Sequence, residues 1–361
     1  MKTDPNLYDY WPYEGRPALR WPNGARLALW VAPNFEYYEL DPPKNPFRTP
    51  WKRPNPDIAG FGIRDYGNRV GALRQMEVLD RFGIRASVSL SAALCDHHPE
   101  IIRMCRERDY ELFSHGIYNT RYNYGLSEAE ERAMLRDSLE TIREKGGQAC
   151  SGYLAPALSH SEHTLDLFAE VTTEMFGDEL PLYSCDLFHD DQPQPVKVKK
   201  NRLISIPYSL EMNDIVVYHQ INSSPPRQYT EVIKRQFDQL YEEGAENGTV
   251  MCIPLHPFLV GQPHDLTVDL REPVDHRRPG RVVAAQAVQE QQRREPQQHD
   301  GSDRHASIIV ERVQEEIGIR RWHQWIMCPV DCARRIPLAN HHGRDEPVQR
   351  NLKCGISFHH T

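Results

Sequence analysis

The chain has 361 residues, with 43 Lys and Arg against 51 Asp and Glu, a formal net charge of −8 and 39% apolar residues. This composition is typical of a globular protein and excludes collagen, a coiled coil and wholesale disorder. The acidic balance argues against a nucleic-acid partner. No apolar run is long enough to enter a membrane, and the N-terminus MKTDPNLYDYWPYEG lacks the apolar centre of a signal peptide. We therefore expect a cytoplasmic protein with no membrane partner.

The first half of the chain alternates strand-like and helix-like segments. Strands are predicted where short apolar runs end at turn residues, and helices where apolar residues recur every three to four positions. In chain order these are a strand at 26–33, a long polar loop, a helix at 67–82, a strand at 86–92, a helix at 99–108, a strand at 110–113 and a helix at 127–144. Gly83 suits a helix C-cap, and Ser127 with Glu130 has the pattern of a capping box.

The second half continues the alternation as far as residue 266. Strands are predicted at 150–155, 203–206 and 249–255, and a helix at 229–244. Strands that alternate with helices predict a mainly parallel α/β sheet or barrel. In such a barrel, chemistry collects at the C-terminal ends of the strands. The eight scattered cysteines are expected to be small buried residues, not disulfides.

The composition changes at residue 267. We divide the chain into an N-terminal arm (1–25), a (β/α) barrel domain (26–266) and an Arg/Gln/His-rich tail (267–361). Apolar residues are too sparse at the start of the tail to repay the entropy of ordering it, so we expect disorder there. Within the tail, only 307–327 has the pattern of a helix.

Chemically useful side chains follow three predicted strands: Asn34 and Glu36, then His115, then His256. A catalytic divalent metal needs carboxylate or imidazole ligands and an open position for water. Glu36 and His115 could supply two ligands, but the next candidate, Asn119, is a neutral amide that binds metals weakly. His256 could act as a general acid or as a hydrogen-bond donor to developing charge.

A third metal ligand remains open at this point. His97 and His98 follow another strand and are candidates, although a solvated histidine pair at the start of a helix is the favoured interpretation.

Several ordered motifs resemble the polysaccharide deacetylase (NodB-homology) family. The resemblance covers about residues 15–266 and is closest to the allantoinase-like, cyclic-imide-hydrolase-like and peptidoglycan-deacetylase-like branch. It implies a distorted, incomplete (β/α) barrel that cleaves amide C–N bonds, often with one zinc held by an Asp and two His. The motifs are VAPNFE, YGNRVGALRQMEVLDRFGIRASVSL, ELFSHGIYNTRY, SGYLAPALS, HDDQP, RQFDQLYEEG and LHPFLVGQPH.

The resemblance also implies roles for individual residues. Glu36 stands at the metal-binding Asp and His115 at the first metal-binding His, whereas Asn119 replaces the second. Asn34 replaces the catalytic-base Asp, which leaves Glu36 as ligand or base, and His256 matches the residue that protonates the leaving group. The site therefore holds one divalent metal, most simply zinc, in a degenerate form, or works without a metal.

The substrate pocket is predicted from polar residues near these motifs. Asn34, Asn119, Arg121 and Gln192 could pair with the carbonyl and N–H groups of a small planar substrate. Each could equally be an ordinary loop residue. The further candidates are Arg69, whose alternative is a salt bridge, Asp191, whose alternative is a turn, and Pro156, which lies where sugar deacetylases carry an Arg-Pro-Pro-Tyr run.

We interpret the chain as a hydrolase of a non-peptide carbon–nitrogen bond in a small cyclic amide, ureide or imide. The alternative in the same class is a metal-dependent N-deacetylase of an acetylated sugar or peptidoglycan. The alternative in a different class is a non-catalytic barrel that binds a small molecule or sugar, because Asn34 and Asn119 replace reactive residues. The expected partners are a small-molecule substrate and further copies of the chain in a homo-oligomer, with the arm as a contact.

The tail does not resemble the closing helix and strand that the family implies. Its Arg, Pro and Gln bias, as in REPVDHRRPGRVVAAQAVQEQQRREPQQ, is what translation of GC-rich sequence in a wrong frame produces. We interpret it as the product of a frameshift near residue 267, the alternative being a genuine appended segment.

Overall fold

The computed structural model describes residues 6–43, 55–217 and 226–263. Within them, one eight-stranded sheet has the order β6-β7-β5-β4-β3-β2-β1-β8. Neighbouring strands are parallel, except that β6 runs antiparallel to β7. The strands are β1 (Leu27–Phe35), β2 (Ser87–Leu90), β3 (Glu111–Ser114), β4 (Gly152–Tyr153), β5 (Leu182–Ser184), β6 (Gln194–Val196), β7 (Leu203–Ser205) and β8 (Thr249–Leu255).

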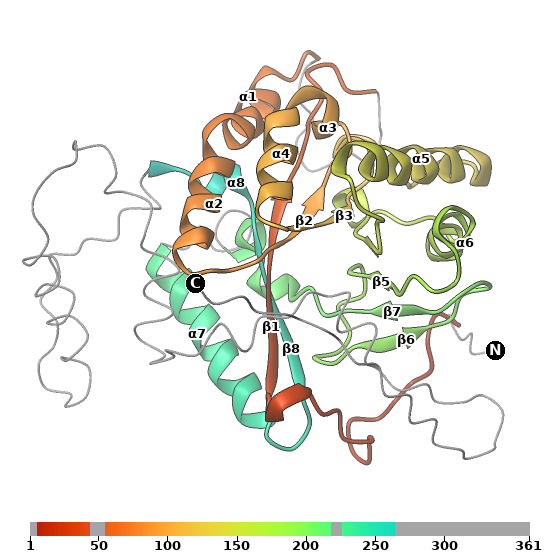
Figure 1. Ribbon diagram of the computed structural model, residues 1–361, viewed down its shortest axis with the longest axis vertical. Helices are drawn as coiled ribbons and strands as arrows, with labels where there is room; N and C mark the ends of the chain where they lie inside the picture. The colour runs from red at the N-terminus through yellow and green to blue at the C-terminus, as the bar shows by residue number, and fades with distance from the viewer. Residues whose placement is uncertain (1–5, 44–54, 218–225, 264–361) are drawn as a thin grey trace, which may run out of the picture.

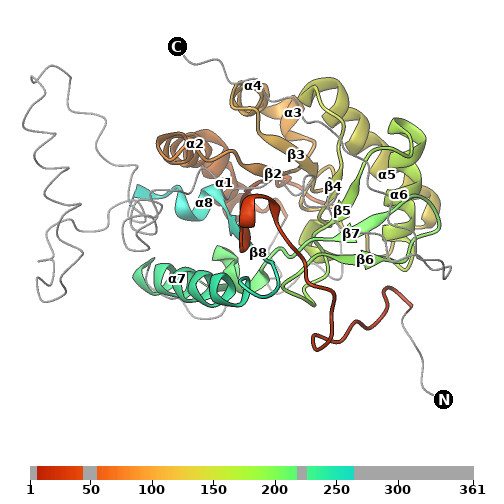
Figure 2. The ribbon, with the colours of Figure 1, turned by 60° about the horizontal axis from the view of Figure 1, so that its bottom comes forward.

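Helices cover the outer face of the curled sheet (Figure 1 and Figure 2). Apolar residues of α2, α4, α5, α6 and α7 join the outward side chains of the strands in the larger hydrophobic core. The helices are α1 (Ile58–Tyr66), α2 (Ala72–Arg81), α3 (Leu94–His97), α4 (Pro99–Glu107), α5 (Glu128–Thr141), α6 (Thr164–Phe176), α7 (Pro226–Glu243) and α8 (Pro257–Val260). Short turns are η1 (Pro22–Gly24), η2 (Gly67–Gly71), η3 (Ile142–Gly146), η4 (Pro156–Leu158) and η5 (Leu210–Met212).

Side-chain alternation along β1 separates the two cores. Leu27, Leu29 and Val31 pack outward against the helices. Ala28 and Trp30 point inward and join a second cluster with Phe113, Tyr183, Tyr208 and Cys252. Because successive strand residues face opposite sides, Asn34 and Glu36 continue the inward row. Apolar side chains therefore fill the barrel interior along most of β1. Polar side chains replace them at the C-terminal end of this strand.

The barrel is closed on one side by irregular chain and not by a strand pair. The N–H of Val250 in β8 donates to the carbonyl of Asp191 at 2.9 Å, and Gln192 Nε2 donates to the carbonyl of Gly248 at 2.7 Å. Higher on β8, the N–H of Cys252 donates to Ser209 Oγ at 3.0 Å. These contacts give the distorted, incomplete (β/α) barrel that the sequence predicts, which confirms the fold class.

Most predicted elements are present, with shifted ends. The strand at 249–255 is confirmed, as are the capping box of Ser127 and Glu130 and the left-handed Gly83 at φ 60°. The long polar loop after β1 was only partly right, because α1 forms within it after an Asp57 cap. The sequence analysis also missed α6, β5 and β6. Residues 267–361, including the helix predicted at 307–327, lie outside the described residues.

The five cysteines of the described ranges are buried and unpaired, as expected: Cys95, Cys105, Cys150, Cys185 and Cys252. Among the described helices, none combines the length and apolar character needed to cross a membrane.

Candidate active site

Three inward-facing side chains meet at the C-terminal ends of β1, β3 and β8. Nε2 of His115 and Nε2 of His256 each lie 3.4 Å from Oε1 of Glu36. All three residues are at most 5% exposed. Each residue follows an inward-facing residue of its strand by an even number of positions, so its own side chain also points inward. Three strands that are far apart in sequence therefore direct these side chains to one place. The structure thus brings together the three residues that the sequence analysis placed at strand ends.

His256 is held by a carboxylate that the sequence analysis did not identify. Asp214, which is completely buried, lies 2.5 Å from Nδ1 of His256 through Oδ1 and accepts the His256 backbone N–H at 2.6 Å through Oδ2. Burial lowers the pKa of His256, but the charges of Asp214 and Glu36 and their hydrogen bonds outweigh burial and raise it to about 10. His256 is therefore an imidazolium at neutral pH, with its Nε2 proton directed at Glu36.

Glu36 has the opposite shift. Burial would raise its pKa, but the positive His256 and hydrogen bonds from His115 and His256 outweigh burial and hold the pKa far below its ordinary value. The carboxylate is ionised at neutral pH. Its second oxygen, Oε2, is buried and has no hydrogen-bond partner within the described structure. Because an unpaired buried acceptor costs about 1–3 kcal/mol, Oε2 is suited to a donor from water or substrate.

His115 is oriented by the backbone. Its Nδ1 lies 2.8 Å from the carbonyl of Leu154. Since a carbonyl can only accept, Nδ1 carries a proton and donates it to Leu154, which turns Nε2 toward Glu36. The structure therefore fixes which nitrogen of His115 faces the site.

Polar groups around this centre are tied to one another. Tyr208 donates to Oδ1 of Asn34 at 2.8 Å, and Nδ2 of Asn34 donates to the carbonyl of Ala32 at 3.2 Å. Nδ2 of Asn119 donates to the Tyr38 hydroxyl at 2.8 Å, which leaves the buried Oδ1 of Asn119 unpaired in the described residues. Asn34 is thus a structural anchor, whereas Asn119 keeps an unpaired acceptor next to its contact with Tyr38.

Arg64 of α1 adds a cation that the sequence analysis did not identify. Its guanidinium lies over the rings of Tyr38, at 4.6 Å, and Phe258, at 4.9 Å. Because Phe258 follows His256 by two residues, Arg64 stands at the rim of the site.

Of the predicted substrate-binding residues, the structure places some near Glu36 and others far from it. Pro156 is buried next to Gly116 and lies close to His115. Asp191 and Gln192 require correction, because their contacts to Val250 and Gly248 place them at the opposite end of β8 from His256. They close the barrel and do not reach the site.

The two predicted arginines make surface ion pairs. Arg69 is exposed and pairs with Asp65, in a separate hollow of about 350 Å³ between α2 and α4. Arg121 pairs with Glu39 at 2.8 Å and is half exposed. Neither contacts Glu36 in the structure, so their substrate role remains a prediction.

The residues present do not fit a tightly held catalytic zinc. Such a site takes three protein ligands and leaves a position for water. Glu36 and His115 supply two, but His256 is occupied as an imidazolium and Asn119 offers only an amide oxygen. In the ranges that the structure describes, no group of three or more His, Cys, Asp and Glu is arranged to hold a metal.

The alternative histidines do not supply the missing ligand. His97 stacks on Tyr37 at 4.2 Å, and His98 faces Asp65 and Glu100 at 3.6 and 3.5 Å. We therefore derive no step through a metal.

Comparison with known proteins shows a similarity to polysaccharide deacetylases. A family model described as polysaccharide deacetylase matches residues 65–176. A putative polysaccharide deacetylase of Schizosaccharomyces pombe is 24% identical over 271 residues, which cover 70% of this chain and 82% of the relative. A crystal structure of a probable polysaccharide deacetylase from Pseudomonas aeruginosa PAO1 superposes with a TM-score of 0.59 at 25% identity, covering 70% of this chain and 85% of that one. The chain is therefore similar to polysaccharide deacetylases.

Two further relatives show the breadth of this family and its fold. The peptidoglycan deacetylase of Helicobacter pylori is 23% identical over 235 residues, which cover 59% of this chain and 78% of the relative. The crystal structure of Puue allantoinase has a TM-score of 0.59 at 23% identity and covers 85% of this chain and 95% of that one. The similarities to deacetylases favour a hydrolase of amide carbon–nitrogen bonds.

Proposed function

We propose that the chain opens the ring of a small cyclic amide, ureide or imide, with Glu36 as general base and His256 as general acid. The observation that carries this proposal is the buried unpaired acceptor Oε2 of Glu36 in the Glu36–His256 ion pair. Oδ1 of Asn119 is a second buried unpaired acceptor, on a side chain held by Tyr38. A ring ureide or imide offers N–H donors, and a water molecule offers O–H donors, to match them.

The reaction follows from the protonation states. Water attacks the ring carbonyl while Oε2 of Glu36 accepts the water proton. His256 donates its Nε2 proton to the ring nitrogen as the C–N bond breaks, and Asp214 stabilises the imidazolium before transfer. The products are a carboxylic acid and the released amine or amide nitrogen on the same molecule. The low pKa of Glu36 makes it a weak base, so orientation within the closed site has to supply part of the rate.

A panel of cyclic ureides and imides tests the proposal. We expect ring opening, followed by product chromatography, that is lost in Glu36→Gln and His256→Gln and persists in the presence of a chelator. Loss of ring opening with the chelator would contradict the metal-free assignment. Chitin oligosaccharides and peptidoglycan fragments test the alternative N-deacetylase, which the family model and the peptidoglycan deacetylase relative favour.

A binding protein would give a different result. It would hold a ring compound with the same affinity in the wild type and in both variants, with no turnover in any of them.

A further inference from the structure

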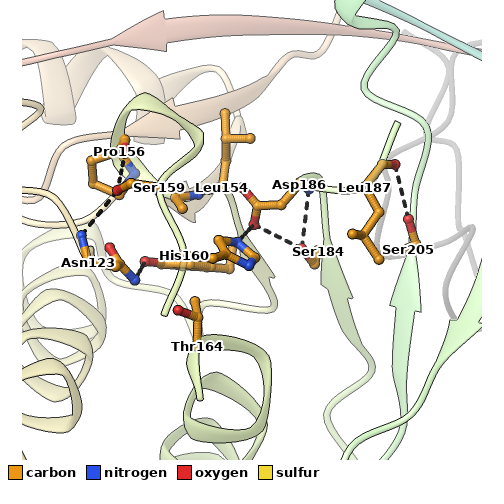
Figure 3. Close-up of polar contacts among 12 residues, drawn as sticks. Asn123, Leu154, Pro156, Ser159, His160, Thr164, Ser184, Asp186, Leu187 and Ser205 are labelled. Carbon is orange, nitrogen blue, oxygen red and sulfur yellow. Dashed lines mark hydrogen bonds and ion pairs between the residues drawn. The ribbon is translucent and has the colours of Figure 1, made fainter. Parts of the chain in front are cut away.

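One peptide group links His115 to a second buried carboxylate. The carbonyl of Leu154 accepts a hydrogen bond from Nδ1 of His115 at 2.8 Å. The N–H of the same peptide group, that of Ala155, donates to Oδ1 of Asp186 at 2.8 Å. Leu154, Asp186 and their neighbours are drawn in Figure 3. A continuous hydrogen-bonded path therefore runs from Asp186 through the Leu154–Ala155 peptide to His115, whose Nε2 faces Glu36.

Asp186 is itself held in place on its other oxygen. Its side chain is 2% exposed, and Oδ2 accepts from Ser184 Oγ at 3.0 Å and lies 3.1 Å from Nε2 of His160. Figure 3 shows Asp186 between these two residues. Burial lowers the pKa of His160, but the charge of Asp186 outweighs burial and raises it. The carboxylate is thus fixed by contacts on both oxygens, with Oδ1 directed at the Ala155 N–H.

The loop that follows this peptide group is strained. Ala157 and Leu158 have φ values of 52° and 54°, in the left-handed region that disfavours side chains with a Cβ. Such residues cost of order 1–3 kcal/mol each and persist only where surrounding contacts impose them. The loop also has to keep Pro156 against Gly116, where an added Cβ would lie 2.5 Å from Pro156 Cγ. The Asp186 contact anchors this strained loop at its first peptide group.

We infer that Asp186 is a positioning residue for His115, acting through the Leu154–Ala155 peptide group. The carboxylate fixes the position of the Leu154 carbonyl and polarises it, since hydrogen bonds in a chain strengthen one another. The stronger acceptor holds the Nδ1 proton of His115 and so fixes the ring with Nε2 toward Glu36. The effect of Asp186 on turnover rests on the proposed function. The effect of Asp186 on the ring of His115 does not.

Two variants distinguish a positioning role of Asp186 from a role in the stability of the fold alone. Asp186→Asn keeps an acceptor for the Ala155 N–H and removes the charge. Glu131→Gln is the matched control: Glu131 is a fully buried carboxylate that accepts from Asn123, Ser161 and Thr164 beside the same loop, without contacting the Leu154–Ala155 peptide.

Nitrogen-15 NMR of histidine-labelled protein reads the ring of His115 directly, and steady-state kinetics on an active ring substrate reads turnover. In Asp186→Asn we expect an upfield shift and faster exchange of the Nδ1 proton of His115. We also expect kcat to fall by about tenfold, at the low end of the effect of residues that orient a catalytic histidine. KM should stay within about twofold, because Asp186 does not touch substrate. Glu131→Gln should leave the His115 resonance and kcat unchanged.

An unchanged His115 resonance and kcat in Asp186→Asn would overturn the inference. If that variant does not fold, the wild type still tests it, because a His115 ring with no proton on Nδ1 overturns it without any variant. If no ring compound is hydrolysed but the His115 resonance shifts as expected, the proposed function fails and the Asp186 linkage stands.

Discussion

The side chain of Glu36 presents one oxygen to two imidazoles and leaves the other free, and this asymmetry defines its role. Glu36→Gln keeps the shape of the side chain but removes the base and the partner of His256. We expect kcat for ring opening to fall by about 10²–10⁴-fold, the usual contribution of a positioned base. Calorimetry should still detect substrate binding, since Asn119 keeps its free acceptor.

Glu39→Gln is the control for this substitution, because Glu39 bears an equal charge three residues later but pairs with Arg121 at the surface. Equal losses of turnover in the two variants would contradict a specific role for Glu36.

Asp214 sets the pH range in which His256 can act. The pKa of His256 is raised from 6.5 to about 10, so the acid form persists until pH approaches 10. Asp214→Asn removes the largest favourable charge, and we expect the alkaline limb of the kcat profile to move to lower pH. An alkaline limb that does not move in the variant would show that another group donates the proton.

The same shift predicts how stability depends on pH. Because the folded pKa of His256 exceeds its unfolded value, its contribution is fully present below about pH 6.5 and is lost as pH rises toward 10. Urea unfolding between pH 6 and pH 10 should therefore show a decline in the wild type that is smaller in Asp214→Asn. A decline of equal size in both proteins would assign the effect to other groups.

How far these residues could be predicted depended on whether their neighbours were local. Glu36, His115 and His256 follow apolar strands directly, so strand alternation was sufficient to place them. Asp214 lies between the strand predicted at 203–206 and the helix predicted at 229–244, 42 residues before its partner, and no spacing rule connects the two. Asp191 and Gln192 formed a polar run that looked like pocket lining, but their main contacts are to the backbone of β8, which only the closed barrel reveals.

At the scale of elements, close packing of the η2 turn against α8 positions His256. A Cβ added to Gly71 would lie 2.1 Å from the carbonyl of Pro257, the residue that follows His256. We expect Gly71→Ala to lower the free energy of unfolding by about 1–3 kcal/mol, as overpacking does, and to reduce kcat. Thermal unfolding and kinetics on the same preparation measure both effects.

Gly62 on α1 provides the matched control, because a Cβ there meets nothing within 4 Å. Gly62→Ala should raise stability by about 0.5–1 kcal/mol through helix propensity and leave kcat unchanged. If Gly71→Ala were equally harmless, the η2 turn would have no part in placing His256.

Element prediction failed where a helix or strand depended on tertiary contacts. The segment that contains α1 is rich in glycine and polar residues, and its helix begins at an Asp57 cap whose side chain accepts the Gly60 N–H at 2.8 Å. β5 and β6 are three residues each, too short for a periodic signal, and they exist because neighbouring strands pair with them. By contrast, α5 carried its capping box in the sequence and could be predicted locally.

At the scale of the whole molecule, the N-terminal arm lies against the β6 edge of the sheet. The carbonyl of Leu7 accepts the N–H of Lys197, directly after β6, at 2.7 Å, and Tyr8 stacks on His189 at 4.1 Å. Arg16 forms two hydrogen bonds to Asp190, at 2.7 and 2.6 Å, with both side chains about one tenth exposed. The arm thus covers an edge strand of its own chain, a position at which open strands otherwise invite association.

An arm that covers the β6 edge of its own chain and an arm that joins subunits give different predictions. Arg16→Ala leaves the mostly buried Asp190 without its cation, so we expect the free energy of unfolding to fall by about 1–3 kcal/mol. Because the released arm uncovers β6, light scattering should show an increase in mass with concentration.

Arg20→Ala is the control. It removes a single hydrogen bond to the exposed Ala245 carbonyl and should change the free energy of unfolding by less than about 0.5 kcal/mol. If the arm instead joins subunits of a homo-oligomer, Arg16→Ala should dissociate the oligomer to monomers, and the measured mass would fall.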